Sequence, residues 1–227
     1  MADLIVTIDG PAASGKSTVA RLLAQKLSAS FLDTGAMYRA VTLATMKDSV
    51  DLSNEDALLD VLQRHTFRFS IRAGRMRISV DAVDVTEMIR NSQVTANARY
   101  IAAAPKVREK LVEMQRQFAA DRQKIVTEGR DQGTVAFADA DVKIFLTADP
   151  AERARRRQAE IGAKDGNESL EQTQKAIEER DQSDQNRDVG PLKPADDAIV
   201  VDTTHLDIDQ VVDKLHELVK EVCSKKK

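Results

Sequence analysis

Short, mostly apolar runs alternate with helical repeats of apolar residues along most of the chain. The apolar runs lie at residues 4–8, 30–33, 124–127, 142–146 and 198–201, and such runs are typical of strands buried on both faces of a parallel sheet. The stretches between them repeat apolar residues every three or four positions, which is typical of helices that bury one face. The alternation predicts an α/β fold with a parallel central sheet.

The period changes from helical to strictly alternating between residues 67 and 85. Apolar and polar residues alternate at 67–71, again at 76–80 after a turn at Ala73-Gly74, and at 83–85. This pattern predicts a short antiparallel meander. An antiparallel meander in an otherwise alternating strand–helix chain indicates an inserted subdomain.

Two helix starts are expected from capping patterns. Ser53, with Asp56 three residues later, predicts a helix that runs to about Leu62. Thr86 predicts a helix that begins at Glu87 and is interrupted near Pro105, because proline lacks the N–H that a helix interior needs.

The composition excludes several classes of protein. With 227 residues, the chain has room for one large domain or for a core with a small satellite. A net charge of -3 argues against a nucleic-acid partner, because phosphate-backbone binding needs a basic excess. Cys223 is the only cysteine, so a disulfide within the chain and a cysteine-rich zinc site are excluded. We find no signal-peptide pattern and no apolar run of membrane-spanning length, and we expect a monomeric cytoplasmic protein without a membrane partner.

A glycine-rich motif follows the first predicted strand. The motif consists of Gly10, Pro11, Ala12, Ala13, Ser14, Gly15, Lys16 and Ser17. It matches G-x-x-x-x-G-K-[ST], and a predicted strand precedes it and a predicted helix follows it. In such a loop, backbone N–H groups surround the phosphates of ATP, Lys16 reaches the β- and γ-phosphates, and Ser17 binds Mg²⁺. Thr18 supports the start of the helix and completes the predicted ATP-binding set.

The loop alone leaves several reactions open, because kinases, GTPases and motor ATPases share it. We find no N-K-x-D motif of the kind that a GTPase needs for base recognition. A DNA motor usually needs a longer and more basic chain. A compact small-molecule kinase therefore fits best.

Charged segments follow two other predicted strands. Thr34 and Arg39 follow the second strand, while Glu128, Arg130 and Asp131 follow the strand that ends at Thr127. The carboxyl ends of parallel strands line the ligand crevice of such folds. We therefore expect Thr34 and Arg39 to face this crevice, Arg39 and Arg130 to reach an acceptor phosphate, and Glu128 to hold the metal directly or through water.

A charged helix is predicted near the C-terminal third of the chain. Arg180, Asp184 and Arg187 are spaced at i, i+4 and i+7, which places them on one helical face. This pattern fits a binding face and a solvated, salt-bridged face about equally well.

Taken together, these motifs resemble bacterial-type cytidylate kinases. The matching segments are V-T-I-D-G-P-A-A-S-G-K-S-T, L-D-T-G-A-M-Y-R, A-x-P-K-V-R-E-K-L, E-G-R-D-Q-G-T-V-A-F, E-R-D-Q-S-D-Q-N-R and P-L-K-P-A-D-D-A. They occur in the family's order from about Ile5 to Asp202. The resemblance implies Mg²⁺-dependent transfer of a phosphoryl group from ATP to CMP or dCMP.

The resemblance also implies a domain plan. It is a three-layer P-loop kinase fold with a core at 1–62 and 105–227, a helical lid at about 152–188, and an inserted CMP-binding subdomain at 63–104. The predicted meander falls within that insertion.

Specific roles follow from the family's motifs. The implied catalytic residues are Lys16, Arg130, Arg153 and Arg157, and the last two close over ATP from the lid. The implied CMP-binding residues are Thr34, Arg39, Arg108, Arg130, Asp131, Arg180, Asp184 and Arg187. Of these, Arg108, Asp131 and Arg187 recognise the cytosine, while Arg180 and Asp184 hold the sugar or a neighbouring phosphate. Ser17 and Glu128 form the implied metal site.

One position departs from the family's pattern. The family usually has a serine shortly before the A-x-P motif, where this chain has Arg99 followed by Tyr100. Two rival functions remain at this stage: a kinase of the same fold with another acceptor, such as a shikimate-like acid, and an ATP-binding regulatory protein. We expect no chemical role for His65, His205 or His216, because none lies in a motif.

Overall fold

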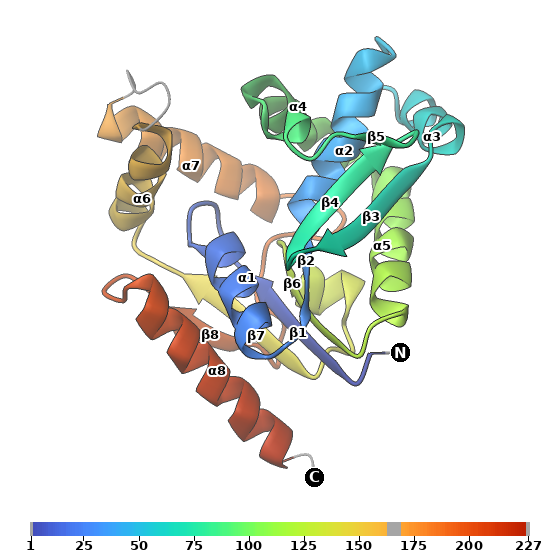
Figure 1. The fold of residues 1–227 in the computed structure, drawn as a ribbon. Helices are drawn as coiled ribbons and strands as arrows, with labels where there is room; N and C mark the ends of the chain where they lie inside the picture. The colour runs from blue at the N-terminus through green and yellow to red at the C-terminus, as the bar shows by residue number, and fades with distance from the viewer. Residues whose placement is uncertain (1, 163–168, 226–227) are drawn as a thin grey trace. The chain divides into compact units, whose positions relative to one another are not determined.

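The chain divides into two compact units. A computed structural model describes residues 2–162 and 169–225, and of residues 161 and 162 it describes only the backbone. The first unit comprises Met1–Asp3 and Ala29–Ile125, and the second comprises Leu4–Ser28 and Val126–Lys227. Figure 1 shows the elements of both units in chain order. The predicted lid at 152–188 includes residues 163–168, which lie outside the described part.

The second unit contains a parallel sheet. Its strands β6 (Lys124–Glu128, from Val126 on), β1 (Leu4–Asp9), β7 (Val142–Thr147) and β8 (Ile199–Asp202) lie next to one another in that order. β1 pairs with β7 in parallel, with Val6 opposite Val142, and β7 pairs with β8 in parallel, with Ile144 opposite Ile199. Val6, Ile8, Val126 and Leu146 are fully buried. The predicted parallel sheet is confirmed. β1 is buried on both faces, which explains its apolar sequence, whereas β7 alternates buried and half-buried residues and β8 leaves Val200 exposed.

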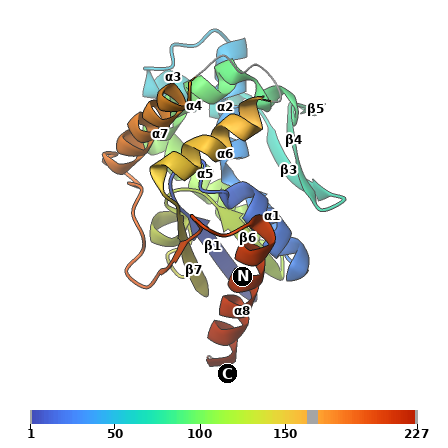
Figure 2. The same ribbon diagram turned by 90° about the vertical axis from the view of Figure 1, so that its left-hand side faces the viewer.

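Helices flank this sheet in the second unit. They are α1 (Lys16–Lys26), α6 (Pro150–Gly162), α7 (Leu170–Gln185) and α8 (Ile208–Lys225). α1 packs against α8, and α6 packs against α7; α6 and α7 lie side by side in both views (Figures 1 and 2). Val19, Leu23, Leu215 and Val219 are buried, as expected for helices that bury one apolar face.

The first unit combines helices with a small antiparallel sheet. Its elements are β2 (Ser30–Asp33), α2 (Thr34–Lys47), α3 (Glu55–Arg64), β3 (Phe67–Arg72), β4 (Arg75–Val80), β5 (Val83–Asp84), a short 3₁₀ turn (Met88–Arg90), α4 (Ser92–Ala103) and α5 (Pro105–Ala120). The sheet has the order β3-β4-β5, and Phe69 lies opposite Ile78 across the first pair. This sheet confirms the predicted meander.

Both capping predictions are wrong in detail. Asn54, rather than Ser53, caps α3, since its Oδ1 accepts a hydrogen bond from the N–H of Ala57 at 3.1 Å. Ser53 instead donates its hydroxyl to Asp51. Thr86 starts no helix, because its Oγ1 accepts from the N–H of Ile78; the α-helix begins at Ser92, capped by Asn91.

His65 connects three elements of the first unit. Its Nδ1 lies 2.5 Å from Asp81 Oδ2, after β4, and its Nε2 lies 3.0 Å from Asp48 Oδ2, at the end of α2. The hydrogen bond to Asp81, followed by that to Asp48, raises the pKa of His65 above its usual value. This ion-pair arrangement has a structural explanation and needs no chemical role.

Across the described part of the chain, the search for bilayer-spanning segments finds no helix with the required length and apolar character.

Candidate active site

The glycine-rich loop joins β1 to α1 in the second unit, as the motif predicts. Gly10 has φ +148°, and a Cβ at this position would lie 2.1 Å from the carbonyl oxygen of Leu146. Gly15 has φ +84° and precedes the first residue of α1. The loop therefore requires glycine at Gly10 for close approach of two backbones, and at Gly15 for a left-handed conformation.

Lys16 is buried at the start of α1. Its Nζ donates to Pro11 O at 2.5 Å and to Ser14 Oγ at 3.2 Å. Burial, followed by the positive charge of Arg130, holds the pKa of Lys16 well below its usual value, and Arg180 acts in the same direction. Glu128 and Asp181 partly offset this effect. Bound phosphates would add negative charge beside Lys16 and so favour its protonated form.

Ser17 and Glu128 form an oxygen-rich pair next to the loop. The Ser17 hydroxyl donates to Glu128 Oε1 at 2.7 Å, and Glu128, at the end of β6, is buried. A hydroxyl and a carboxylate suit Mg²⁺, which usually takes one or two protein ligands together with substrate phosphates. In the described residues, no group of three or more His, Cys, Asp or Glu side chains could hold a metal by itself. The donor set therefore fits a metal that arrives with a nucleotide.

Asp9 is a functional-site residue to which sequence reasoning assigned no role. Its Oδ1 accepts from the N–H of Gln132 at 2.9 Å, and its Oδ2 accepts from the N–H of Gly133 at 2.8 Å. These bonds fix the segment that directly follows Arg130 and Asp131 onto the end of β1. A charged residue at the end of a buried strand is the same signal that singled out Glu128.

Asp9 predicts a specific pH dependence of stability. Burial, only partly offset by the two backbone hydrogen bonds, raises the pKa of Asp9 from 3.8 to about 6. The folded protein therefore holds this proton more tightly than the unfolded chain does. The contribution of Asp9 to stability is fully present below about pH 4 and is lost as the pH rises to about 6, with a total change of about 3 kcal/mol.

Urea denaturation of the wild type and of Asp9→Asn at pH 4, 5, 6 and 7 measures this effect. We expect the difference in unfolding free energy, wild type minus variant, to fall across that range, because asparagine does not titrate. Other carboxylates titrate equally in both proteins, so they cancel in the difference. Parallel pH curves for the two proteins would contradict the assignment.

Asp184 accepts hydrogen bonds from two of the arginines that were predicted to bind the acceptor. Arg130 Nε donates to Asp184 Oδ2 at 2.8 Å, and Arg187 Nη2 donates to Asp184 Oδ1. Asp184 is buried. Exposed Arg180 lies on the same helix, and its charge contributes to the lowered pKa of Lys16. The face of α7 that carries Asp184 is therefore buried and salt-bridged, while Arg180 on the same helix is exposed.

Arg187 does not lie on the helix as its spacing predicted. α7 ends at Gln185, because the carbonyl of Asp184 accepts from the N–H of Leu192 instead of continuing the helix. Arg187 reaches Asp184 from the segment that follows the helix. Asp131, which precedes the segment held by Asp9, is also buried, and its charge acts on Asp9.

The two predicted lid arginines occupy different environments. Arg153 is buried, and its Nη1 donates to the carbonyl of Ala12 in the loop at 3.1 Å. The side chain of Arg157 is 42% exposed and pairs with Glu160 at 3.2 Å. The structure therefore brings Arg153, but not Arg157, to the phosphate-binding loop.

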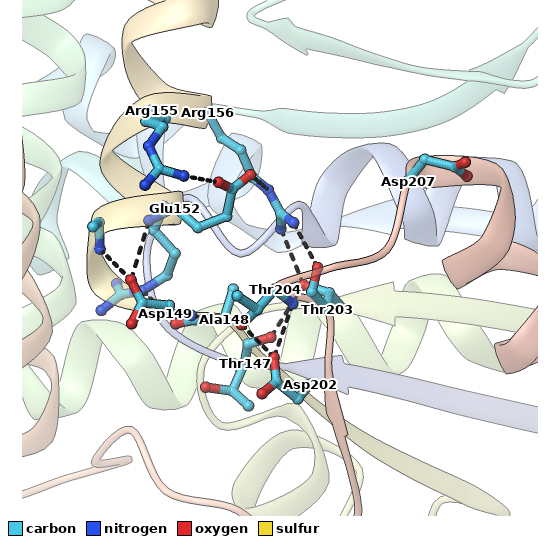
Figure 3. Close-up of polar contacts among 12 residues, drawn as sticks. Thr147, Ala148, Asp149, Glu152, Arg155, Arg156, Asp202, Thr203, Thr204 and Asp207 are labelled. Carbon is cyan, nitrogen blue, oxygen red and sulfur yellow. Dashed lines mark hydrogen bonds and ion pairs between the residues drawn. The ribbon is translucent and has the colours of Figure 1, made fainter.

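Polar contacts fix the start of α6 to the ends of β7 and β8, as Figure 3 shows. Arg156 donates to Thr203 Oγ1 at 3.0 Å and to Thr203 O at 2.6 Å. The N–H of Asp149 donates to Thr204 Oγ1 at 2.9 Å, and Asp149 Oδ1 accepts from the N–H of Ala151. No local pattern indicates the contacts between Arg156 and Thr203, because the two residues are 47 positions apart in the sequence.

The remaining acceptor-side candidates lie in the first unit. Asp33 caps α2 by accepting from the N–H of Ala36 at 2.8 Å, and Arg39 Nη2 lies 3.5 Å from Asp33 Oδ2. Thr34, the first residue of α2, is buried. The capping bond explains why the helix begins directly after β2.

Arg108 and Arg99 differ sharply in burial. Arg108 on α5 is 3% exposed, with its guanidinium 5.7 Å from the centre of the Tyr38 ring and its Nη1 donating to Ala102 O. Arg99 on α4 is exposed, and its guanidinium lies 4.9 Å from the centre of the Tyr100 ring. Arg99 therefore lies over the aromatic ring of its neighbour.

A strand, a glycine-rich loop and a helix, with a buried lysine and an adjoining Ser–Glu pair, define a P-loop nucleotide-binding protein. In its fold the chain is similar to a gluconokinase from Sinorhizobium meliloti, with a TM-score of 0.52 and 12% identity over 98% of this chain and 95% of that one. The profile of the family described as "Cytidylate kinase" matches residues 6–221. The chain belongs to the cytidylate kinase family.

Curated relatives agree with this family over the whole chain. A cytidylate kinase from Streptococcus thermophilus is 43% identical over 99% of this chain and 100% of its own length. A cytidylate kinase from Limosilactobacillus reuteri is 46% identical over 96% of this chain and 95% of its own. The expectation of a bacterial-type enzyme of this family is confirmed.

Proposed function

We propose that this protein transfers the γ-phosphoryl group of ATP to CMP and dCMP, giving ADP with CDP or dCDP. One observation carries the proposal within the second unit. The end of β6 serves both sides of the reaction: Glu128 accepts from Ser17 of the phosphate-binding loop at 2.7 Å, and Arg130, two residues further on, donates to Asp184 at 2.8 Å. A single strand end that carries a donor-side carboxylate and an acceptor-side arginine suits two phosphates that must meet for direct transfer.

The chemistry needs positioning and charge neutralisation rather than a general base. The attacking oxygen of a nucleoside monophosphate is already anionic near neutral pH. Lys16 would stabilise charge on the β- and γ-phosphates, and Arg130 would orient the acceptor phosphate. Arg153, placed at the loop, would add positive charge on the donor side. We retain Arg157 as a candidate that reaches the donor only when the predicted lid closes.

Ser17 and Glu128 are the residues that would hold Mg²⁺. Their hydroxyl and carboxylate oxygens suit this ion, as described above. When bound, Mg²⁺ supplies charge neutralisation on the phosphates of ATP.

The acceptor-binding residues that the family's motifs imply are proposed for three parts of the acceptor. Thr34, Arg39 and Arg130 are proposed for the CMP phosphate, and Arg180 and Asp184 for the sugar or a neighbouring phosphate. Arg108, Asp131 and Arg187 are proposed for the cytosine, with Asp131 accepting from its exocyclic amine. The domain boundaries at 62–63 and 104–105, the lid, the monomeric state and the cytoplasmic location stay predictions.

A panel of acceptors tests the proposal. ADP release is measured with ATP and Mg²⁺, offering CMP, dCMP, UMP, AMP and shikimate in parallel. We expect stimulation by CMP and dCMP, whose cytosine offers an amine to Asp131. We expect no stimulation by shikimate, because a sugar-like acid offers no such amine. Stimulation by a different acceptor alone would assign another kinase activity, and slow turnover that no acceptor stimulates would favour an ATP-dependent switch.

Asp131→Ala tests base recognition separately. We expect kcat/KM for CMP to fall by about 10²-fold or more, because a buried polar contact to the substrate is lost. The ratio of CMP to UMP activity should fall with it. Asp139→Ala is a matched control, since Asp139 follows in the same segment and is exposed. An unchanged CMP-to-UMP ratio in Asp131→Ala would remove Asp131 from base recognition.

A further inference from the structure

Helix α7 contains two buried carboxylates three residues apart, Asp181 and Asp184. Asp184 holds the acceptor-side arginines Arg130 and Arg187. Asp181 is equally buried, at 6% exposure, and contacts the phosphate-binding loop instead. Burial of a carboxylate is costly unless hydrogen bonds and ion pairs replace its lost hydration. The contacts of Asp181 with the loop and with Arg153 supply this replacement.

Asp181 and Arg153 bind both backbone polar groups of one loop residue. The N–H of Ala12 donates to Asp181 Oδ1 at 2.8 Å, and the carbonyl of Ala12 accepts from Arg153 Nη1 at 3.1 Å. Arg153 Nη1 also forms an ion pair with Asp181 Oδ2. A single ion pair, supplied by two helices, thus fixes the peptide groups on both sides of Ala12.

An apolar contact supports the same arrangement. Ala12, Ala154 of α6 and Ile177 of α7 form one buried cluster, and Ala13 packs against it. The loop is therefore held against the α6–α7 pair by side-chain packing as well as by the ion pair.

The loop needs such external support because its backbone is strained. The strain lies at Ala13, which has a Cβ and yet adopts φ 57°. A left-handed conformation at a residue with a Cβ persists only where the surroundings enforce it. Arg153 can enforce it, because its Nε is anchored to Ala148 O at 3.2 Å and Arg156 fixes the same helix to Thr203.

We propose that Asp181 is a positioning residue for phosphoryl transfer, which holds the loop at Ala12 and directs Arg153 toward it. Asp181 itself contacts neither substrate; it acts through the loop that binds ATP. The role of Asp181 in phosphoryl transfer rests on the proposed function. The effect of Asp181 on ATP binding can be measured without any acceptor.

Calorimetry of MgATP binding to Asp181→Ala and Asp181→Asn tests the proposal. We expect the Kd for MgATP to rise by about 10-fold in Asp181→Ala, because the loop loses its fixed conformation. Asparagine keeps an acceptor for the N–H of Ala12 but loses the ion pair, so its Kd should lie between those of the wild type and Asp181→Ala. Glu178→Gln, an exposed change one turn earlier on α7, should match the wild type.

Steady-state kinetics separate positioning from general damage. In Asp181→Asn we expect KM for ATP to rise while KM for CMP changes less than about 2-fold. A merely structural role would lower the melting temperature while leaving the ATP affinity of the folded protein unchanged, and that result would overturn the proposal. If Asp181→Ala does not fold, the ATP affinity of Asp181→Asn alone decides whether the proposal holds.

The two proposals fail in distinguishable ways. If the wild type phosphorylates no acceptor but Asp181→Asn still weakens MgATP binding, the proposed function fails and the role of Asp181 stands. If the wild type phosphorylates CMP and Asp181→Asn binds MgATP with wild-type affinity, the role of Asp181 is overturned.

Discussion

Replacing Lys16 with methionine should lower kcat by about 10³-fold, because the buried ammonium group that neutralises the transferring phosphates is lost. Methionine has a similar length and is apolar, so it should fit the buried position. The pKa of Lys16 is already held low by burial and by Arg130. Removal of the charge should therefore leave the free energy of unfolding close to that of the wild type.

Lys26→Met provides the matched control for this prediction. Lys26 ends the same helix, is exposed, and pairs with Asp213. We expect wild-type kcat from this variant. Circular dichroism and thermal melting of both variants establish that they fold. A Lys16→Met enzyme that keeps kcat within about 10-fold of the wild type would contradict the assigned role of Lys16.

Gly10→Ala should be the most destabilising single substitution in the loop. The new Cβ would lie 2.1 Å from the carbonyl oxygen of Leu146, and a backbone atom cannot move aside as a flexible side chain can. We expect a loss of about 4 kcal/mol or more in the free energy of unfolding, or failure to fold. In any protein that does fold, β1 and β7 must shift apart, and ATP binding should be lost.

Gly15→Ala distinguishes a close contact from backbone strain. Gly15 also has positive φ, but a Cβ there would meet no atom within 4 Å. Its cost should therefore be only the conformational one, about 1–2 kcal/mol. Urea denaturation without nucleotide compares the two variants. Equal destabilisation by both would show that the approach to Leu146 is not the dominant cost.

Local patterns predicted much of this fold because they report burial directly. β1 is mostly apolar because the sheet buries both of its faces. β4 alternates because Met76 and Ile78 are buried while Arg75 and Arg77 are exposed, and β3 alternates half-buried apolar residues with exposed polar ones. The glycine-rich loop was recognisable because its backbone geometry restricts which residues it can contain.

The missed features depend on partners that are distant in sequence. Asp181 is 169 residues from Ala12, and Asp9 is 123 residues from Gln132, so no local pattern indicates either pair. Arg153 and Arg157 are spaced i, i+4 on α6, so their spacing does not separate the arginine that contacts Ala12 from the one that pairs with Glu160. The end of α7 before Arg187 depends on the N–H of Leu192, whose position follows from tertiary structure.

Product analysis of one reaction tests the central claim most directly. The protein is incubated with ATP, Mg²⁺ and CMP, and the nucleotides are separated by anion-exchange chromatography over time. Direct transfer predicts that CDP and ADP appear together in a one-to-one ratio and that neither forms at a comparable rate without CMP. ADP and inorganic phosphate without CDP would show hydrolysis instead of transfer and would contradict the proposed function.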